Sequence, residues 1–142
     1  MVMVLFVCTG NAARSQMAEG WLKNLNSDVS VISAGTKPEG VSKIAIKVMK
    51  EIGIDISNHT SDNLNNVDWQ GADFAITLCG SANETCVSMP WPETCKRLHW
   101  PIKDPVSEDE YRNARDEIKQ KINNFFDNPK EDRSKLFLEQ IL

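Results

Sequence analysis

An apolar run at residues 3–7 passes directly into a Cys-x5-Arg-Ser loop, which leads into a pattern of apolar residues at helical spacing. Cys8 begins the loop, and Arg14 and Ser15 end it. A strand, a short loop and a helix in this order are the building blocks of parallel α/β sheets. The order constrains the fold strongly, because it places the loop at the carboxyl end of a buried strand, where such sheets bind ligands.

The residue types of this loop predict an anion site. Backbone N–H groups, the positive end of the helix dipole and the Arg14 guanidinium would converge on one spot and form a cradle for a tetrahedral oxyanion, with Cys8 at its base. The same field favours the thiolate, to which Ser15 can donate a hydrogen bond. A cysteine beside a buried strand is more often a small core residue, but this setting favours a nucleophile. The predicted cradle consists of Thr9, Gly10, Asn11, Ala12, Ala13 and Arg14.

Strand-like runs and helical patterns alternate along the rest of the chain. This alternation predicts an α/β fold, a three-layer sandwich in which helices cover both faces of a four-stranded parallel sheet. Ser107 and Glu110 form a capping-box pattern at the start of a long amphipathic helix. The strands are expected at residues 2–7, 29–33, 74–78 and 97–100, and the shorter helices at about 15–25 and 42–52. The apolar face of the second helix is expected to be Ile44, Val48, Met49 and Ile52.

The 142 residues are expected to form a single domain, 1–142, which is large enough to bury a core without cross-links. Residues 1–127 form its core in this interpretation, and residues 128–142 are a C-terminal extension after Asn128-Pro129, which ends the long helix. The apolar residues of the extension favour a short helix packed on the domain, with a dimer contact as the alternative. We expect a monomer.

Charge and composition exclude several classes of partner. The net charge is −4 and there is no basic cluster, which argues against nucleic acid and membrane surfaces. No apolar stretch approaches the roughly 18 residues of a membrane span, and no charged leader precedes the first strand, so we expect a cytoplasmic protein. Four cysteines in such a chain favour redox chemistry, because their spacing fits a disulfide framework or a metal site poorly.

Several ordered motifs carry a family resemblance over about residues 3–126. They are residues 7–21 around the loop, 33–35 (Ser-Ala-Gly), 55–62 (Asp-Ile-Ser-Asn-His-Thr-Ser-Asp), 77–79 (Thr-Leu-Cys) and 104–105 (Asp-Pro). With these motifs the chain resembles the thioredoxin-coupled arsenate reductases, which share the fold of low-molecular-weight protein tyrosine phosphatases. Ala13 is a departure, since many of these relatives have a further cysteine there.

The resemblance implies a reaction and a set of roles. Cys8 would attack arsenate, Cys79 and Cys86 would be the second and third redox cysteines of a disulfide relay, and Asp104 would be the general acid. The product would be arsenite, as in arsenic resistance and detoxification. Thioredoxin would then reduce the protein, with glutaredoxin and glutathione as the alternative donor. An Asp-Pro pair is often only a turn, but its place before the long helix favours the catalytic interpretation of Asp104.

The spacing of the second and third redox cysteines has a structural consequence. If the segment between Cys79 and Cys86 were helical, the two Cα atoms would lie ~10 Å apart along the helix axis. A disulfide tolerates about 7 Å at most. Pairing the two would therefore require the segment to unwind, and its composition is poor for a stable helix.

Two further features are left with more than one interpretation. Asn11, Glu19, Ser33 and Asp62 match residues that surround potassium in some of the resembling enzymes; the alternative is that they hold the loop by hydrogen bonds. No other cofactor is expected. Cys95 has no counterpart in the motifs, so we interpret it as a bystander thiol, with a resolving role as the alternative.

The runner-up function is a low-molecular-weight protein tyrosine phosphatase, which needs only Cys8, Arg14, Ser15 and Asp104. Phosphatases of this kind commonly have two aromatic residues directly after Asp-Pro, whereas here the first aromatic residue is Tyr111. A third hypothesis is a protein that binds or senses oxyanions or metalloids through its thiols without turnover.

Overall fold

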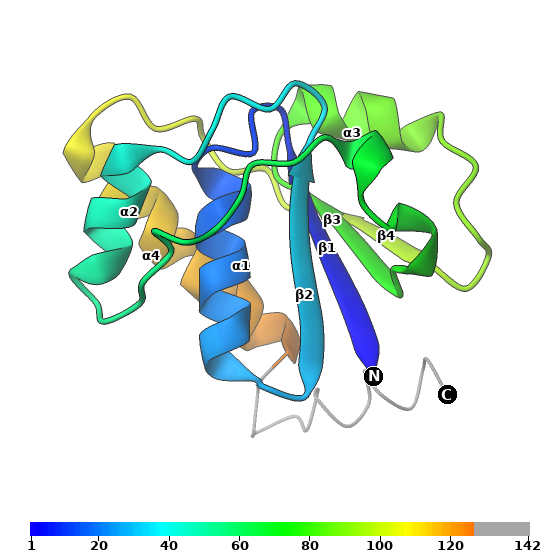
Figure 1. Cartoon of the computed structure of the whole chain (residues 1–142), viewed down its shortest axis with the longest axis horizontal. Coiled ribbons are helices and arrows are strands. Elements are labelled where there is room, and N and C mark those ends of the chain that lie inside the picture. The colour runs from blue at the N-terminus through cyan, green and yellow to red at the C-terminus, as the bar shows by residue number, and fades with distance from the viewer. Residues whose placement is uncertain (127–142) are drawn as a thin grey trace.

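A four-stranded parallel sheet in the order β2-β1-β3-β4 forms the centre of the molecule (Figure 1). The computed structural model describes residues 1–126, so the extension and its expected short helix lie outside the described residues. The strands are β1 (Val2–Cys8), β2 (Val29–Gly35), β3 (Phe74–Thr77) and β4 (Lys96–His99). All four lie within two residues of their predicted positions, and the predicted α/β class is confirmed.

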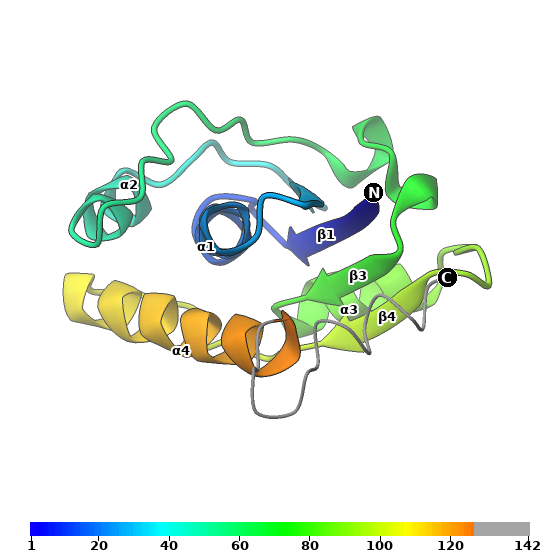
Figure 2. The ribbon, with the colours of Figure 1, turned by 90° about the horizontal axis from the view of Figure 1, so that it is seen from below.

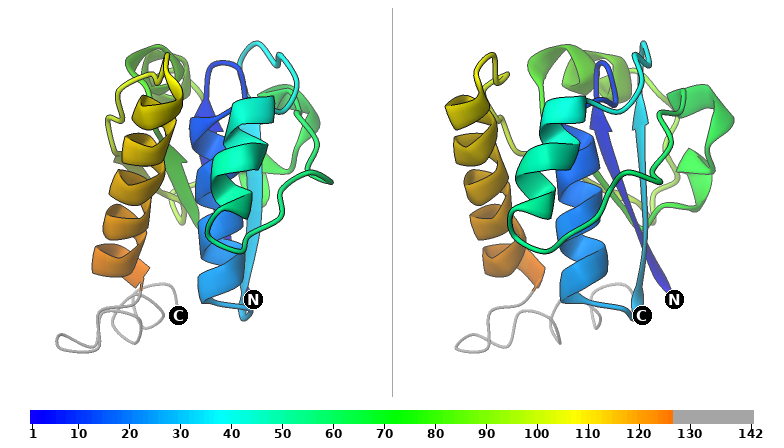
Figure 3. Two further views of the ribbon diagram at one scale, coloured as in Figure 1. Left: turned by 90° about the vertical axis from the view of Figure 1, so that its left-hand side faces the viewer. Right: turned by 60° about the vertical axis from the view of Figure 1, so that its left-hand side comes forward.

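Helices cover both faces of the sheet, as predicted. Three of them pack on one face (Figures 1 and 3): α1 (Arg14–Leu25), α2 (Lys43–Lys50) and α4 (Glu108–Phe126). In Figure 2, which looks along α1, the longer α4 lies against it. The other face carries α3 (Gly80–Val87) and two short 3-10 turns, η1 (Leu64–Asn66) and η2 (Trp69–Gly71).

The burial of each element explains how well its sequence predicted it. Every residue of β3 is buried and β1 is nearly so, because both strands lie inside the sheet. β4 is an edge strand whose polar residues are mostly exposed. The expected apolar face of α2 is wrong in part: Ala45, Val48 and Met49 are buried, whereas Ile44 and Ile52 are more than a third exposed.

The start of α4 follows the predicted capping pattern. The Ser107 hydroxyl accepts a hydrogen bond from the Glu110 N–H at 3.2 Å, and the Glu110 carboxylate accepts one from the Val106 N–H at 3.1 Å. These contacts satisfy N–H groups that the first helical turn leaves unpaired. They fix where α4 begins, and hence the position of the preceding loop that carries Asp104.

The carboxyl ends of the strands lie together at one edge of the sheet, at the top of Figure 1. There Gly35, the last residue of β2, pairs with Cys8. A Cβ atom on Gly35 would lie 2.6 Å from the Thr9 carbonyl oxygen and 2.8 Å from the Asn11 nitrogen. Glycine is therefore required at this position, because these backbone atoms of the Cys-x5-Arg-Ser loop approach closely.

We expect Gly35→Ala to lower the free energy of unfolding by about 1–3 kcal/mol, as overpacking does elsewhere. Urea denaturation of the reduced protein measures this. Gly80→Ala is the matched control, because nothing lies within 4 Å of its added Cβ atom. An equal effect of the two changes would mean that the close approach at Gly35 contributes nothing to stability.

Candidate active site

The loop between β1 and α1 forms the floor of a cavity of about 470 Å³. Cys8 is at its base and is only 3% exposed. The cavity is lined by Cys8, Thr9, Gly10, Ala12, Ala13, Arg14, Glu39, Asp104, Pro105 and Tyr111. The structure thus brings the predicted nucleophile and most of the predicted cradle, all from one segment, together with the proposed acid Asp104.

The peptide groups of the loop are oriented as an anion cradle requires. The carbonyl oxygens of Thr9, Gly10 and Ala12 each accept a 2.8 Å hydrogen bond from the segment after β2. A trans peptide directs its C=O and the following N–H in opposite directions, so the next N–H groups are directed toward the cavity. The first turn of α1 has no side-chain cap and no acidic residue, which leaves its positive end available to an anion. The donors to the three carbonyls are Lys37, Glu39 and Ser42.

Ser15 lies beside the sulfur of Cys8. Its hydroxyl lies 2.9 Å from the Cys8 Sγ atom, and the Asn11 side-chain amide donates to the same hydroxyl oxygen at 2.8 Å. Because Asn11 occupies the oxygen as a donor, the Ser15 hydrogen is free to point at the sulfur. A hydroxyl that donates to Cys8 stabilises the thiolate over the thiol.

Asn11 differs from the rest of the predicted cradle, because its side chain is fully buried behind the loop. Its backbone adopts the left-handed region, with φ 45°, which asparagine tolerates better than most residues. Its amide donates to Ser33 at 3.0 Å, and its carbonyl accepts from the Asp62 N–H at 2.9 Å. The Asn11 side chain therefore holds the loop in shape and does not line the cavity.

Arg14 reaches over the cavity from the first turn of α1. Its Nη1 donates to the Ile102 carbonyl oxygen at 2.8 Å, and its Nη2 lies 3.6 Å from an Asp104 carboxylate oxygen. The Ile102 contact fixes the plane of the guanidinium, which can then present its remaining N–H groups to two oxygens of an anion. Asp104 is 75% exposed and lies at the cavity wall, where a general acid would act on a leaving oxygen.

Cys79 lies beside the cradle and also begins α3. Its sulfur is 3.2 Å from the Thr9 hydroxyl oxygen, and it accepts a hydrogen bond from the Ala82 N–H at 3.4 Å. The sulfur is thus the N-cap of α3. Any reaction that takes this sulfur into a disulfide would remove the cap, and lost caps destabilise helices by roughly 0.5–2 kcal/mol.

Cys86 lies in the last turn of α3 and is 3% exposed. Burial raises the pKa of its thiol to about 11. The Trp91 indole N–H donates to the Cys86 carbonyl oxygen at 2.7 Å and holds this end of the helix. Because the segment is helical, pairing Cys79 with Cys86 requires α3 to unwind, as the spacing predicted.

The fourth cysteine, Cys95, lies far from the cradle in sequence and at the sheet edge that carries β4. It is 8% exposed, and burial raises the pKa of its thiol. Cys95 and Cys86 line one cavity on the α3 face of the sheet. All four cysteines are free thiols in this structure.

Glu19 and Ser33, both proposed as cation ligands, belong to one hydrogen-bonded network with Asn11. The Ser33 hydroxyl donates to the Glu19 carboxylate at 2.6 Å. Lys23 pairs with the same carboxylate, and the His59 Nε2 atom lies 3.7 Å from it. Burial lowers the pKa of His59, although the Glu19 charge acts in the opposite direction. The Lys23 ammonium therefore supplies the positive charge beside Glu19.

Asp62, the fourth residue of the proposed cation set, contributes its backbone to this network. Its N–H donates to Asn11, and its carboxylate accepts a 2.7 Å hydrogen bond from the Thr60 hydroxyl. Within residues 1–126, no cluster of three or more His, Cys, Asp or Glu residues could hold a metal ion. Likewise, no helix in this part of the chain is long and apolar enough to cross a membrane.

Glu39 and Tyr111 are cavity residues that the sequence did not assign to the site. Tyr111 lies in the first turn of α4, and its hydroxyl oxygen accepts a 3.3 Å hydrogen bond from Ser42. The only sequence signal for Glu39 is its place in the loop after a strand. The two aromatic residues common directly after Asp-Pro are absent, but the first turn of α4 brings Tyr111 to the cavity.

The model of the low molecular weight phosphotyrosine protein phosphatase family matches residues 3–135. The chain belongs to this family, whose fold is the one that the resemblance of its motifs implied. The match also extends beyond residue 127, into the stretch that we separated as an extension.

Within this family the chain is similar to arsenate reductases. It is 46% identical over 128 residues to arsenate reductase 2 of Staphylococcus saprophyticus, an alignment that covers 88% of this chain and 96% of the relative. The structure of an arsenate reductase in an oxidized state matches with a TM-score of 0.77 and 36% identity, covering 87% of this chain and 95% of the other. The structure of a thioredoxin-dependent arsenate reductase from Corynebacterium glutamicum matches with a TM-score of 0.74 and 26% identity, covering 89% of this chain and 60% of the other.

We expect Arg14→Lys to lower the second-order rate constant for oxyanion turnover on the order of a hundredfold, the usual cost of losing one donor to a transition state. Lysine keeps the charge but loses the planar fork and the Ile102 contact. Steady-state kinetics with arsenate measures the loss. Lys37→Arg, an exchange on an exposed loop residue, is the control and should have little effect. A fully active Arg14→Lys variant would contradict bidentate binding.

Proposed function

We propose that the protein is an arsenate reductase that converts arsenate to arsenite in the cavity above Cys8. The observation that carries this proposal is the position of Cys79, whose sulfur is one 3.2 Å hydrogen bond from Thr9 of the cradle. Hydrolysis of a phosphate ester needs no second thiol at that place, whereas reduction does. The similarity to arsenate reductases supports the same conclusion.

The first step is a substitution at arsenic. The Cys8 thiolate attacks arsenic while Asp104 gives its proton to a departing hydroxide, which leaves as water. The cradle N–H groups and Arg14 hold the remaining oxygens as charge develops on them. Ser15 can donate a hydrogen bond to the Cys8 thiolate until it reacts.

The second step transfers two electrons. Cys79 attacks the Cys8 sulfur, an S–S bond forms, the S–As bond breaks, and its electron pair stays on arsenic, which leaves as arsenite. Cys86 then attacks Cys79 and releases Cys8 as a thiolate. The Cys79–Cys86 disulfide is the form that a reductant must reduce. Similarity to a thioredoxin-dependent enzyme supports thioredoxin as that reductant.

Phosphatase activity on aryl phosphates is a second candidate, and the position of Tyr111 favours it. Tyr111 lines the cavity above the cradle, and its hydroxyl is held by the contact with Ser42. An aromatic wall of this kind can pack against the ring of a substrate. The reaction would use Cys8, Arg14 and Asp104 and would be independent of Cys79 and Cys86.

A monovalent cation at Asn11, Glu19, Ser33 and Asp62 stays a prediction. The shared network of the first three residues supports it, because a cation there would offset the charge of Glu19. Lys23 already does so in this structure, and no step of the proposed reaction depends on a cation. A cytoplasmic location and a monomeric state are likewise proposals, as is glutaredoxin with glutathione as the alternative donor.

We expect Cys86→Ser to permit one turnover of arsenate and to trap a Cys8–Cys79 disulfide, because the first two steps need no third thiol. Cys79→Ser should block even the first release of arsenite. Arsenite quantification after one equivalent of arsenate, with peptide mass spectrometry of the disulfides, measures both. The electron donor is identified with the wild-type protein, by comparing its rate of multiple turnover with thioredoxin and with glutaredoxin and glutathione.

Two controls accompany this experiment. Cys8→Ser should abolish turnover while oxyanion binding persists, since a hydroxyl is a poor nucleophile near neutral pH. Hydrolysis of an aryl phosphate should survive both Cys79→Ser and Cys86→Ser. Release of arsenite by the Cys79→Ser variant, in one turnover or in several, would contradict the proposed relay.

We expect the stability of α3 to set the rate of Cys79–Cys86 formation. Thr85 is exposed in this helix, and its hydroxyl bonds only to the preceding turn. Thr85→Ala should stabilise α3 by about 0.5 kcal/mol and Thr85→Gly should destabilise it by a similar amount. The two variants should differ about fivefold in the rate of disulfide transfer, measured by acid quench, with equal rates of arsenite release. Equal transfer rates would show that unwinding is not limiting.

A further inference from the structure

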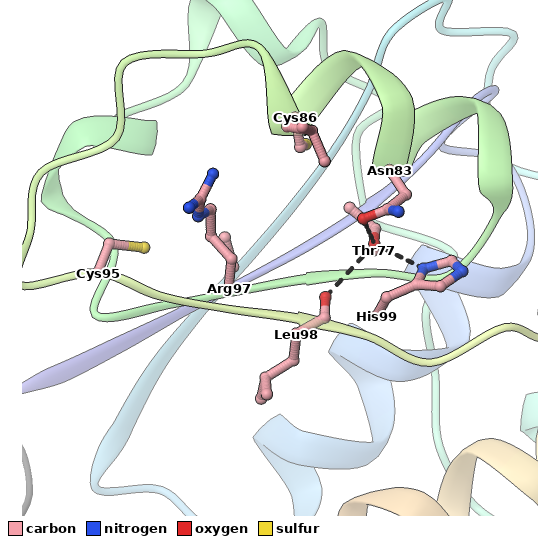
Figure 4. A pocket seen from close by; sticks show the side chains of 9 residues that line it. Thr77, Asn83, Cys86, Cys95, Arg97, Leu98 and His99 are labelled. Atoms are coloured by element: carbon pink, nitrogen blue, oxygen red, sulfur yellow. Dashed lines mark hydrogen bonds between the residues drawn. The ribbon is translucent and has the colours of Figure 1, made fainter.

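A second cavity, of about 380 Å³, lies between α3 and β4, on the face of the sheet that carries α3 (Figure 4). It contains no residue of the oxyanion cradle. Its walls hold two thiols, a guanidinium and an imidazole, which is an unusual concentration of reactive groups outside the site already described. The cavity is lined by Ala75, Thr77, Asn83, Cys86, Val87, Cys95, Arg97, Leu98 and His99.

Arg97 is the charged group of this cavity. It lies on the edge strand β4, and Figure 4 shows its guanidinium between the Cys95 and Cys86 side chains. Among residues 1–126, no carboxylate forms a salt bridge or hydrogen bond with it. Arg97 is exposed, so water solvates its guanidinium. Because it lines the same cavity as the buried Cys86, this guanidinium is available to a negative charge that forms there.

Cys86 is the group that must acquire such a charge. A thiol attacks a disulfide as the thiolate, yet burial raises the pKa of Cys86 to about 11, and the sulfurs of Cys79 and Cys95 act in the same direction. Arg97 acts in the opposite direction on Cys86 and on Cys95. His99, the other titratable group of the cavity, has its Nδ1 atom 2.8 Å from the Thr77 hydroxyl.

We propose that Arg97 is the positioning residue of the third thiol of the relay, and that its guanidinium stabilises the Cys86 thiolate as α3 unwinds. This assignment rests on the proposed function. Arg97 acts from β4, an element separate from α3, and its long side chain can follow the sulfur for part of its path. It touches neither arsenate nor Cys8, so it would affect the last transfer alone.

The step is balanced without a further reagent. The Cys86 thiol loses its proton to solvent, and the thiolate attacks Cys79 of the Cys8–Cys79 disulfide. A Cys79–Cys86 bond forms, the Cys8–Cys79 bond breaks, and Cys8 leaves as a thiolate that Ser15 stabilises. The number of disulfides is unchanged, so nothing is oxidised or reduced overall.

The test is a single turnover with one equivalent of arsenate and no external reductant, sampled by acid quench between pH 6 and 10. Released arsenite reports the first transfer, and alkylation with peptide mass spectrometry reports the two disulfides. In Arg97→Gln we expect unchanged arsenite release, accumulation of Cys8–Cys79, and conversion to Cys79–Cys86 about tenfold slower at neutral pH. The pH profile of conversion should be displaced upward by about one pH unit, which corresponds to that factor.

Three control variants separate charge from structure. Arg97→Lys should restore most of the conversion rate, because it keeps the charge. Lys96→Gln removes the neighbouring cation of β4, which does not line the cavity, and should convert like the wild type. His99→Gln should also leave the pH profile of conversion in place. An Arg97→Gln variant with a wild-type profile overturns the assignment, and so does an Arg97→Lys variant that is as slow as Arg97→Gln.

The assignment and the proposed function fail in different ways. If wild-type protein releases no arsenite, or never forms Cys79–Cys86, the relay itself is wrong. If wild-type protein completes the relay and Arg97→Gln matches it, only the role of Arg97 is wrong. A disulfide between Cys79 and Cys95 in the wild type would overturn the assignment by making Cys95 the resolving thiol.

Discussion

The buried amide of Asn11 is the contact on which the site depends. It donates to Ser15 and Ser33 and accepts from the Asp62 N–H, so one side chain ties the loop to α1, to β2 and to the segment after α2. Each such bond is worth about 1 kcal/mol while paired, and a buried group left unpaired costs about 1–3 kcal/mol. The same amide fixes the direction of the Ser15 hydroxyl. The hydrogen bond to the Cys8 sulfur therefore depends on a side chain buried behind the cradle.

Helix α3 couples the reaction to a change of shape. Eight residues are too few for an isolated helix, so contacts at its start, middle and end must hold it. These are the Cys79 sulfur as N-cap, the Thr77 hydroxyl bonded to Asn83 at 3.2 Å, and the Trp91 indole bonded to the Cys86 carbonyl. A Cys8–Cys79 disulfide would remove the first contact. The buried Cys86 would then be released only after Cys79 has reacted, which sets the order of the relay.

Features that depend on local sequence were predictable, and features that depend on long-range packing were not. The strand, loop and helix around Cys8 follow from one contiguous segment, as does the cap at Ser107. The face of α2 was wrong in part: Ala45 is buried, whereas Ile44 and Ile52 are partly exposed. Which face is covered depends on α1 and α4, which pack against α2. The spacing of residues within one segment determines which of them share a face of a helix or strand. It does not determine which other helix or strand packs on that face.

The candidate site divides in the same way. Cys8, Arg14 and Ser15 could be predicted because the chemistry of the loop lies within eight residues. Tyr111 could not, because it reaches the cavity only through the packing of α4 beside α2, where it meets Ser42. Arg97 carries no signal in the sequence, since a charged residue on an edge strand is ordinarily solvated. Only the structure shows that Arg97 shares a cavity with the Cys86 thiol.

The cradle alone cannot decide between reduction and hydrolysis, because arsenate and phosphate have the same shape and charge. The atom bound to the Cys8 sulfur, arsenic or phosphorus, determines which reaction follows. When Cys79 attacks the Cys8 sulfur, the leaving atom must accept an electron pair, which arsenic(V) does readily and phosphorus(V) does not. A phosphoryl group on Cys8 can therefore leave only by transfer to water or another acceptor. The Cys79 sulfur beside Thr9 is useful only to a reducible oxyanion. One site thus supports two reactions, and the second thiol acts in only one of them.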